Sequence, residues 1–182
     1  MLMDSLLSER LRPPHGGMAD LEVAGLAELA TGSLHRFVDW PNPDVPSWRA
    51  GVYTVWDDQG VLLYVGMAGR GLLADAHLSQ PDGARKRRGL ADRLNAHASG
   101  RRSGDQFCIY VFDRFVLPTL TPGQVRAAAV GDLSLDMLTR DYIRQHLRYR
   151  FVVTNDGQAA LALERAARRD GVDGMVPVLN PL

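Results

Sequence analysis

The sequence predicts a small α/β domain of the α+β type, in which a mostly antiparallel sheet is flanked by helices. Two observations lead to this class. Two strand-like stretches joined by a turn are followed by amphipathic helices and further strand-like stretches, an order that fits a mixed domain better than a helical bundle. The 182 residues, of which 46% are hydrophobic and 23% charged, suffice for one domain with a hydrophobic core.

The chain before residue 51 is expected to form an N-terminal arm and helix. Residues 1–19 contain Pro-Pro and Gly-Gly pairs, which interrupt regular structure. Apolar residues then recur at helical spacing over 20–31, with Asp20 as a candidate N-cap. The three prolines within 40–48 predict an extended connector to the main domain, which we expect to span 51–182.

Residues 51–66 are expected to form a β-hairpin. The triplet Gly-Val-Tyr at 51–53 begins the first strand, and the triplet Tyr-Val-Gly at 64–66 ends the second. The intervening Asp-Asp-Gln-Gly at 57–60 has the residues of a tight turn, because glycine accepts the positive φ that such turns need. Antiparallel pairing would bring Tyr53 and Tyr64 close together on neighbouring strands.

The remaining elements follow from hydrophobic periodicity and from the concentration of β-branched and aromatic residues. We expect a helix at 89–98, a strand at 107–117, a helix within 133–148, a strand at 149–154 and a helix at 157–169. Thr154, Asn155 and Asp156 are alternative caps for the last helix. The segments 67–88 and 118–154 are expected to be insertions in the main domain.

Basic residues are unevenly distributed, although the net charge is zero. The candidates for contact with a polyanion are Arg70, Arg85, Lys86, Arg87, Arg88, Arg101 and Arg102, and a second group comprises Arg140, Arg144, Arg148 and Arg150. Arginine suits bidentate contact with phosphate, so these groups predict a nucleic-acid surface. The alternative is that an arginine-rich composition simply places arginine on solvated faces.

Several protein classes are not expected. No apolar run approaches the roughly 20 residues that span a bilayer, and the N-terminus lacks the pattern of a secretory signal. Cys108 is the only cysteine, which excludes an internal disulfide and a zinc site built mainly from cysteine. We therefore expect a cytoplasmic protein without membrane contact.

Two predicted helices carry polar residues suited to phosphate chemistry. Arg93 and His97 are four residues apart, so they share one helix face and can point a guanidinium and an imidazole at one phosphate. The alternative is that Arg93 and His97 are an ordinary surface arginine and surface histidine. Glu164 has mostly apolar helical neighbours and should border a buried face, where a carboxylate needs a cation or a hydrogen bond. A structural salt bridge to Arg168 or Arg93 is the alternative.

The hairpin triplets resemble the signature of the GIY-YIG nuclease family, with valine in place of isoleucine in both. The resemblance extends to Arg93 with His97, to Glu164 and to Asn180 before Pro181, in the family's order over residues 51–181. Arg70 is a rival for the arginine role. Met67 departs from the pattern, because many relatives have lysine or another polar residue after the second triplet.

The resemblance implies a metal-dependent endonuclease, similar to the family's compact restriction enzymes, that hydrolyses phosphodiester bonds in double-stranded DNA. It implies that Glu164 binds Mg²⁺ or Mn²⁺ and that Asn180 braces the active site. Tyr53 is the first choice as base and Tyr64 as phosphate ligand, although the sequence does not separate them. A homodimer is expected if the cleavage site is symmetric. The alternatives are a binding module with little or no cleavage and a nuclease for RNA or branched DNA.

Overall fold

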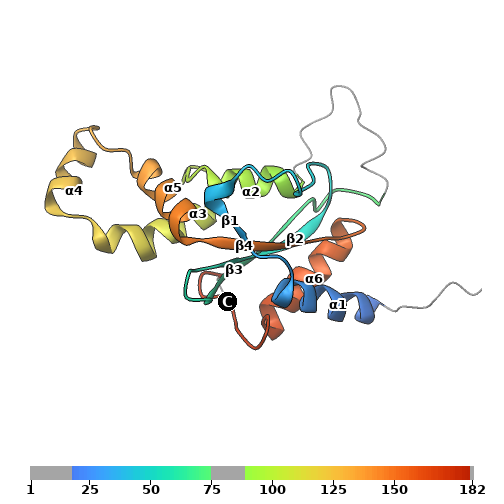
Figure 1. Cartoon of the computed structure of the whole chain (residues 1–182). Coiled ribbons are helices and arrows are strands. Elements are labelled where there is room, and N and C mark those ends of the chain that lie inside the picture. The colour runs from blue at the N-terminus through green and yellow to red at the C-terminus, as the bar shows by residue number, and fades with distance from the viewer. Residues whose placement is uncertain (1–17, 75–88, 181–182) are drawn as a thin grey trace, which may run out of the picture.

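The computed structural model describes residues 18–74 and 89–180, which fold around one four-stranded antiparallel sheet (Figure 1). The strands are β1 (His35–Arg36), β2 (Gly51–Trp56), β3 (Leu62–Ala68) and β4 (Arg148–Val153), and they lie in the order β1-β4-β2-β3. Helices cover both faces of the sheet. The predicted α+β class is therefore confirmed.

The hairpin forms as predicted from β2 and β3, which pair antiparallel. Its turn is held by the Asp57 carboxylate, which accepts hydrogen bonds from the backbone N–H groups of Gln59 and Val61. Tyr53 lies opposite Gly66 in the ladder, and Tyr64 lies opposite Val55. Because side chains alternate along a strand, this register puts both tyrosines on the same face of the sheet as diagonal neighbours.

The helices divide between the two faces of the sheet (Figure 1). They are α1 (Met18–Thr31), α2 (Leu90–Ala98), α3 (Gln106–Val111), α4 (Pro122–Ala129), α5 (Leu135–His146) and α6 (Gly157–Asp170). The face that carries Tyr53 packs against α2, α3 and α5 through Leu94, Phe107 and Ile143. The opposite face packs against α1 and α6 through Leu29 and Leu163. Residues 18–50 thus contribute to the same sheet and cores as the hairpin.

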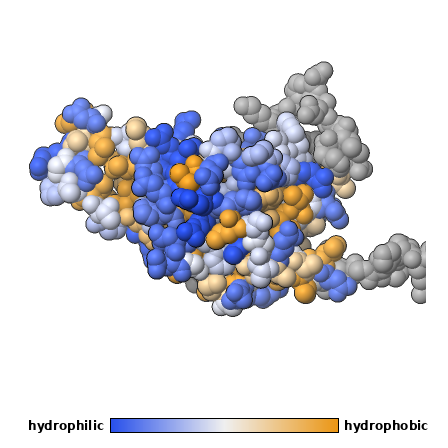
Figure 2. All heavy atoms as spheres, in the orientation of Figure 1, coloured by the Kyte–Doolittle hydropathy of each residue, from blue (hydrophilic) through white to orange (hydrophobic). Residues whose placement is uncertain are grey.

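Helix α4 extends away from the sheet (Figure 1), and none of its residues is buried. A capping box between Thr121 and Gln124 begins the helix. Leu117, Val125 and Val130 are exposed around it, where Figure 2 shows apolar side chains among polar ones. Among the described residues, no helix combines the length and the apolar character needed to cross a membrane.

Several predicted elements are confirmed with small shifts of their ends. The predicted strand at 149–154 is β4, and it pairs with both β1 and β2 in the interior of the sheet. Asp156, one of the three candidate caps, accepts hydrogen bonds from the N–H groups of Gln158 and Ala159 at the start of α6. Helix α1 begins at Met18, so Asp20 lies in its first turn instead of capping it.

The predicted strand at 107–117 is wrong, because this segment is helical. It forms α3, a π-helix at Phe112–Val116 and a 3₁₀ turn at Leu117–Thr119. The helix begins at Asp105, whose side chain accepts a hydrogen bond from the Phe107 N–H. The buried positions Phe107, Cys108, Val111 and Phe112 follow helical spacing and line one face.

The predicted basic groups have different outcomes. The run at 85–88 lies outside the described residues. In the second group, Arg140 and Arg144 belong to α5, whereas Arg148 and Arg150 belong to β4. Arg144 donates to the Ala98 carbonyl, and Arg150 donates to the Gly32 carbonyl. The second group therefore does not form one helical surface for DNA.

Candidate active site

An open cleft of about 540 Å³ lies at the outer edge of β3, between residues of α2 and α6. Strand β3 is at the end of the sheet, so no further strand pairs with its outer edge. Helices α2 and α6, from opposite faces of the sheet, both reach the cleft at this edge. The charged residues that line the cleft are Arg70, Arg93, Arg165, Arg168 and Glu164. Four guanidinium groups and one carboxylate therefore surround this space, which favours an anionic ligand.

Tyr53 is fully buried behind this cleft. Its hydroxyl lies 2.7 Å from Nε2 of His97, and Nε of Arg93 donates to the hydroxyl oxygen at 3.3 Å. Burial raises the pKa of Tyr53 far above its ordinary value, so the phenol keeps its proton in this state. Because Arg93 also lines the cleft, it connects the buried tyrosine with the site that a ligand would enter.

His97 and Asp105 form a buried pair on the other side of Tyr53. Nδ1 of His97 lies 2.7 Å from Oδ2 of Asp105, and both residues are buried. Burial lowers the pKa of His97, so the imidazole is neutral near pH 7. Burial acts to raise the pKa of Asp105, but its hydrogen bond with His97, the Arg93 guanidinium and the Phe107 N–H together hold the pKa below its usual value. The carboxylate is thus ionised beside a neutral imidazole.

Tyr64 is the more accessible of the two tyrosines, since it is only partly buried. Its ring centroid lies 6.3 Å from that of Tyr53. Burial raises the pKa of Tyr64, and the nearby Arg93 guanidinium opposes this rise. The Glu164 carboxylate is also close enough to act on the Tyr64 pKa. The structure thus brings both tyrosines together with residues from α2 and α6.

Gly66 makes the close approach of the tyrosines possible. A Cβ atom at this position would collide with the hydroxyl of Tyr53 and would lie 2.8 Å from the ring of Tyr64. Gly51, the first residue of the other triplet, has no room either, because a Cβ atom there would meet the Val152 carbonyl and the Leu90 side chain. Both glycines of the hairpin triplets are therefore required by packing.

Glu164 borders the buried face of α6 as predicted, with its side chain only 12% exposed. Its Oε1 forms an ion pair with Nη1 of Arg168 at 3.1 Å. The salt bridge to Arg168 considered from the sequence is therefore present. A carboxylate that lines an open cleft also suits Mg²⁺ or Mn²⁺, because Mg²⁺ commonly takes one or two protein carboxylates and fills its shell with water and phosphate oxygens.

Asn180 braces the edge of the sheet next to Tyr64. Its Oδ1 accepts from the Val65 N–H at 2.7 Å, and its Nδ2 donates to the Val65 carbonyl at 2.9 Å. Just before it, Val178 and Leu179 donate to the carbonyls of Leu62 and Leu63. This segment covers the first half of the β3 edge and leaves the second half to the cleft.

Asp105 is the residue that the sequence analysis missed. It is one of three buried groups whose ligand atoms lie within 4.8 Å of one another: His97, Asp105 and Cys108. They do not fit a metal ion, because both imidazole nitrogens and both carboxylate oxygens are already hydrogen-bonded. Burial also raises the pKa of the Cys108 thiol, which keeps it protonated. An aspartate two residues before the apolar run at 107–112 was the available signal, since it predicts a helix cap.

Of the other described residues predicted to bind phosphate, only Arg70 lies at the cleft. Arg70 lines the cleft beside Arg93, so these two rivals share one site. Arg102 pairs with Asp136 at 2.8 Å and lies over the Phe112 ring. Neither Arg101 nor Arg102 lines the cleft. Met67, the residue that departs from the family pattern, does line it.

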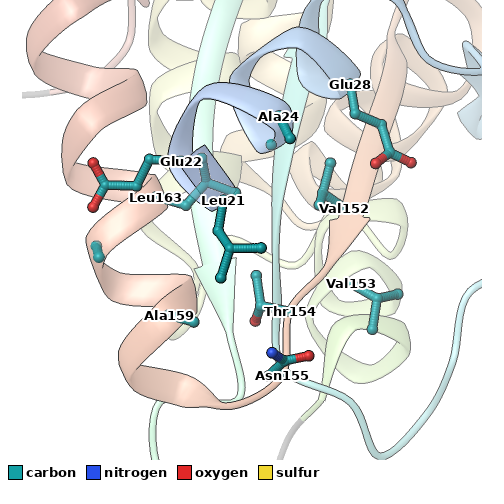
Figure 3. A pocket seen from close by; sticks show the side chains of 12 residues that line it. Leu21, Glu22, Ala24, Glu28, Val152, Val153, Thr154, Asn155, Ala159 and Leu163 are labelled. Carbon is teal, nitrogen blue, oxygen red and sulfur yellow. The ribbon is translucent and has the colours of Figure 1, made fainter. Parts of the chain in front are cut away.

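A second hollow lies on the opposite side of the sheet, between α1, α6 and the end of β4 (Figure 3). It measures about 220 Å³, and its floor is made of apolar side chains such as Leu21, Val152 and Leu163. Within 18–74 and 89–180, no residue predicted for catalysis or for phosphate binding lines it.

Comparison with protein-family models, with curated proteins and with solved structures found no match to this chain.

Proposed function

We propose that this protein is a metal-dependent endonuclease that hydrolyses phosphodiester bonds, with double-stranded DNA as the expected substrate. One observation carries the proposal: Glu164 and Arg93 line the same cleft, and Arg93 is hydrogen-bonded to the buried Tyr53–His97 pair. Carboxylate, guanidinium and phenol groups thus converge from α6, α2 and the hairpin. The resemblance to GIY-YIG nucleases supports the same chemistry.

The charge of the cleft suits a nucleic-acid backbone. Arg70 and Arg165 are exposed at the cleft, and they offer donors to phosphate oxygens without breaking a buried contact. Arg93 lies deeper and is held by Tyr53, which fits a group that stabilises negative charge as the phosphorus is attacked. The open shape of the site fits a polymer better than an enclosed small molecule.

Glu164 would hold the divalent cation, Mg²⁺ or Mn²⁺, together with water and a phosphate oxygen. When bound, the cation would polarise the phosphate and stabilise the leaving oxygen. Arg168 would have to leave the carboxylate or share it, since it pairs with Glu164 at 3.1 Å. Asn180 holds β3 and thereby the position of Tyr64.

The accessibility of the tyrosines supports roles that differ from those expected from the sequence. Tyr53 was the first choice as base, but its hydroxyl is enclosed and donates toward His97. Tyr64 is partly exposed and near both Arg93 and Glu164, so we assign it to the attacking water. Tyr53 then acts by holding Arg93, and His97 acts through Tyr53.

A nicking assay on supercoiled plasmid with and without Mg²⁺ tests the proposal. Glu164→Gln should lower the nicking rate by about 100-fold or more, because the cation loses its only expected protein carboxylate. Glu28→Gln is the matched control, since Glu28 is exposed on α1 and does not line the cleft. Equal nicking by wild type and Glu164→Gln, or no dependence on Mg²⁺, would contradict the proposal.

A nucleic-acid-binding module without cleavage is the second candidate, and Met67 is the observation that favours it. Met67 lines the cleft at the position where many members of the family it resembles have a lysine or another polar residue. Binding of duplex DNA at an affinity that Arg70→Gln weakens, with no nicking in Mg²⁺ or Mn²⁺, would support this candidate. Parallel assays on RNA and on branched DNA identify the preferred substrate.

A further inference from the structure

We propose that Asp105 is a positioning residue of the candidate active site. It sets the direction of a chain of hydrogen bonds that passes through His97 and Tyr53 and ends at Arg93. This inference rests on the proposed function, and it adds a residue that neither the sequence patterns nor the family resemblance pointed to.

The direction of the chain follows from which groups can donate. The Asp105 carboxylate can only accept, so the hydrogen of the neutral imidazole must lie on Nδ1 of His97. Nε2 then has a free lone pair and accepts the hydroxyl hydrogen of Tyr53 at 2.7 Å. This leaves the lone pairs of the Tyr53 oxygen directed away from His97.

Arg93 is the group that uses those lone pairs. Its Nε–H donates to the Tyr53 oxygen at 3.3 Å, and a guanidinium cannot accept a hydrogen bond in return. The contact therefore exists only if the Tyr53 hydrogen points to His97, which Asp105 ensures. Because Arg93 lines the cleft, the buried carboxylate acts on the orientation of a guanidinium at the ligand site.

The substitution Asp105→Asn should reverse the chain. Oδ1 of Asp105 accepts from the backbone N–H of Phe107, which can only donate, whereas the imidazole can exchange its hydrogen between its nitrogens. The asparagine oxygen should therefore remain on Phe107 and the amide NH₂ should face Nδ1. The imidazole hydrogen then moves to Nε2 and donates to Tyr53, whose own hydrogen faces Arg93. The same substitution beside a catalytic histidine in serine proteases imposes the wrong tautomer.

The experiment combines a spectroscopic readout with a double-mutant cycle. Long-range ¹H–¹⁵N NMR should show the Nδ1–H tautomer of His97 in the wild type and the Nε2–H tautomer in Asp105→Asn. The nicking rate of Asp105→Asn should fall by about 100- to 1000-fold, as for the loss of one transition-state donor. In a Tyr53→Phe background, where the chain is already cut, Asp105→Asn should change the remaining rate by less than about threefold.

Asp156→Asn is the matched control, because Asp156 caps α6 in the same way but contacts none of the described histidines, and asparagine caps a helix equally well. It should alter neither tautomer nor rate. A merely structural role for Asp105 predicts the same loss of rate in both backgrounds, and that result would overturn the inference. An Nε2–H tautomer in the wild type would overturn it as well. Absence of nicking by the wild type would instead refute the proposed function, while the NMR readout still decides the direction of the chain.

Discussion

The substitution Gly66→Ala tests the central contact of the site without relying on any activity. The new Cβ would collide with the Tyr53 hydroxyl and approach the Tyr64 ring to 2.8 Å. Tyr53 cannot swing away, because its ring is fully buried and its hydroxyl is held by His97 and Arg93. The substitution must therefore displace the phenol from its partners.

The expected cost has two parts. Overpacking a well-filled core costs about 1–3 kcal/mol, and leaving buried polar groups such as Nε2 of His97 without a partner costs about 1–3 kcal/mol more. Gly66→Ala should thus lower the free energy of unfolding by about 2–6 kcal/mol, measured by urea denaturation near pH 7. Gly71→Ala is the matched control, because none of the described atoms lies within 4 Å of its added Cβ.

The result that would refute this reasoning is a Gly66→Ala protein as stable as Gly71→Ala. Retention of the Tyr53–His97 hydrogen bond in that variant, seen as an unchanged His97 NMR signature, would show that the hairpin has room for a side chain. The close packing of the two tyrosines would then not explain why glycine ends the second triplet.

Three further predictions concern groups around the cleft. Burial lowers the pKa of His97, so as pH falls below about 6.5 the unfolded state binds a proton at this imidazole before the folded state does. The free energy of unfolding, measured by urea titration, should therefore decrease below that pH. A His97→Gln variant that keeps the full decrease would contradict this. Arg168→Gln should strengthen Mn²⁺ binding by about two- to fivefold, since it frees Glu164 from a partly exposed ion pair; Arg169→Gln is the control, and calorimetric titration measures both. Asn180→Leu removes two hydrogen bonds to β3 and should cost about 1–3 kcal/mol in urea denaturation; an unchanged midpoint would exclude the brace.

The parts of the fold that local sequence determines were predictable. The hairpin has its turn residues at 57–60, and α6 has both a capping aspartate and a glycine, Gly171, with φ of 81° at its end. The segment at 107–117 was not predictable from composition. Its aromatic and β-branched residues, interrupted by Asp113 and Arg114, suit a buried strand or a buried helix, and only the cap at Asp105 distinguishes them.

The residues of the candidate site also differ in whether local sequence could suggest them. The residues on the hairpin, α2 and α6 could be proposed from spacing, because each lies at a fixed place on a local element. Asp105 could not, since a loop of six residues, 99–104, separates it from α2 and only the tertiary fold directs its carboxylate to His97. The surroundings of the two tyrosines are also tertiary, because Tyr53 packs against His97 of α2 and Tyr64 against Phe107 of α3, and no local pattern reveals either contact.

The two hydrogen bonds that the Asn180 side-chain amide makes to β3 have a consequence for self-association. An unpaired sheet margin offers its peptide groups to any other extended chain, and neighbouring molecules can join there into aggregates. In this protein, the backbone at Leu62, Leu63 and Val65 is already occupied by the segment around Val178. The remaining open stretch borders arginines, whose mutual repulsion between two copies discourages the same stacking. One short segment thus both holds β3 beside Tyr64 and occupies backbone groups that another chain could otherwise pair with.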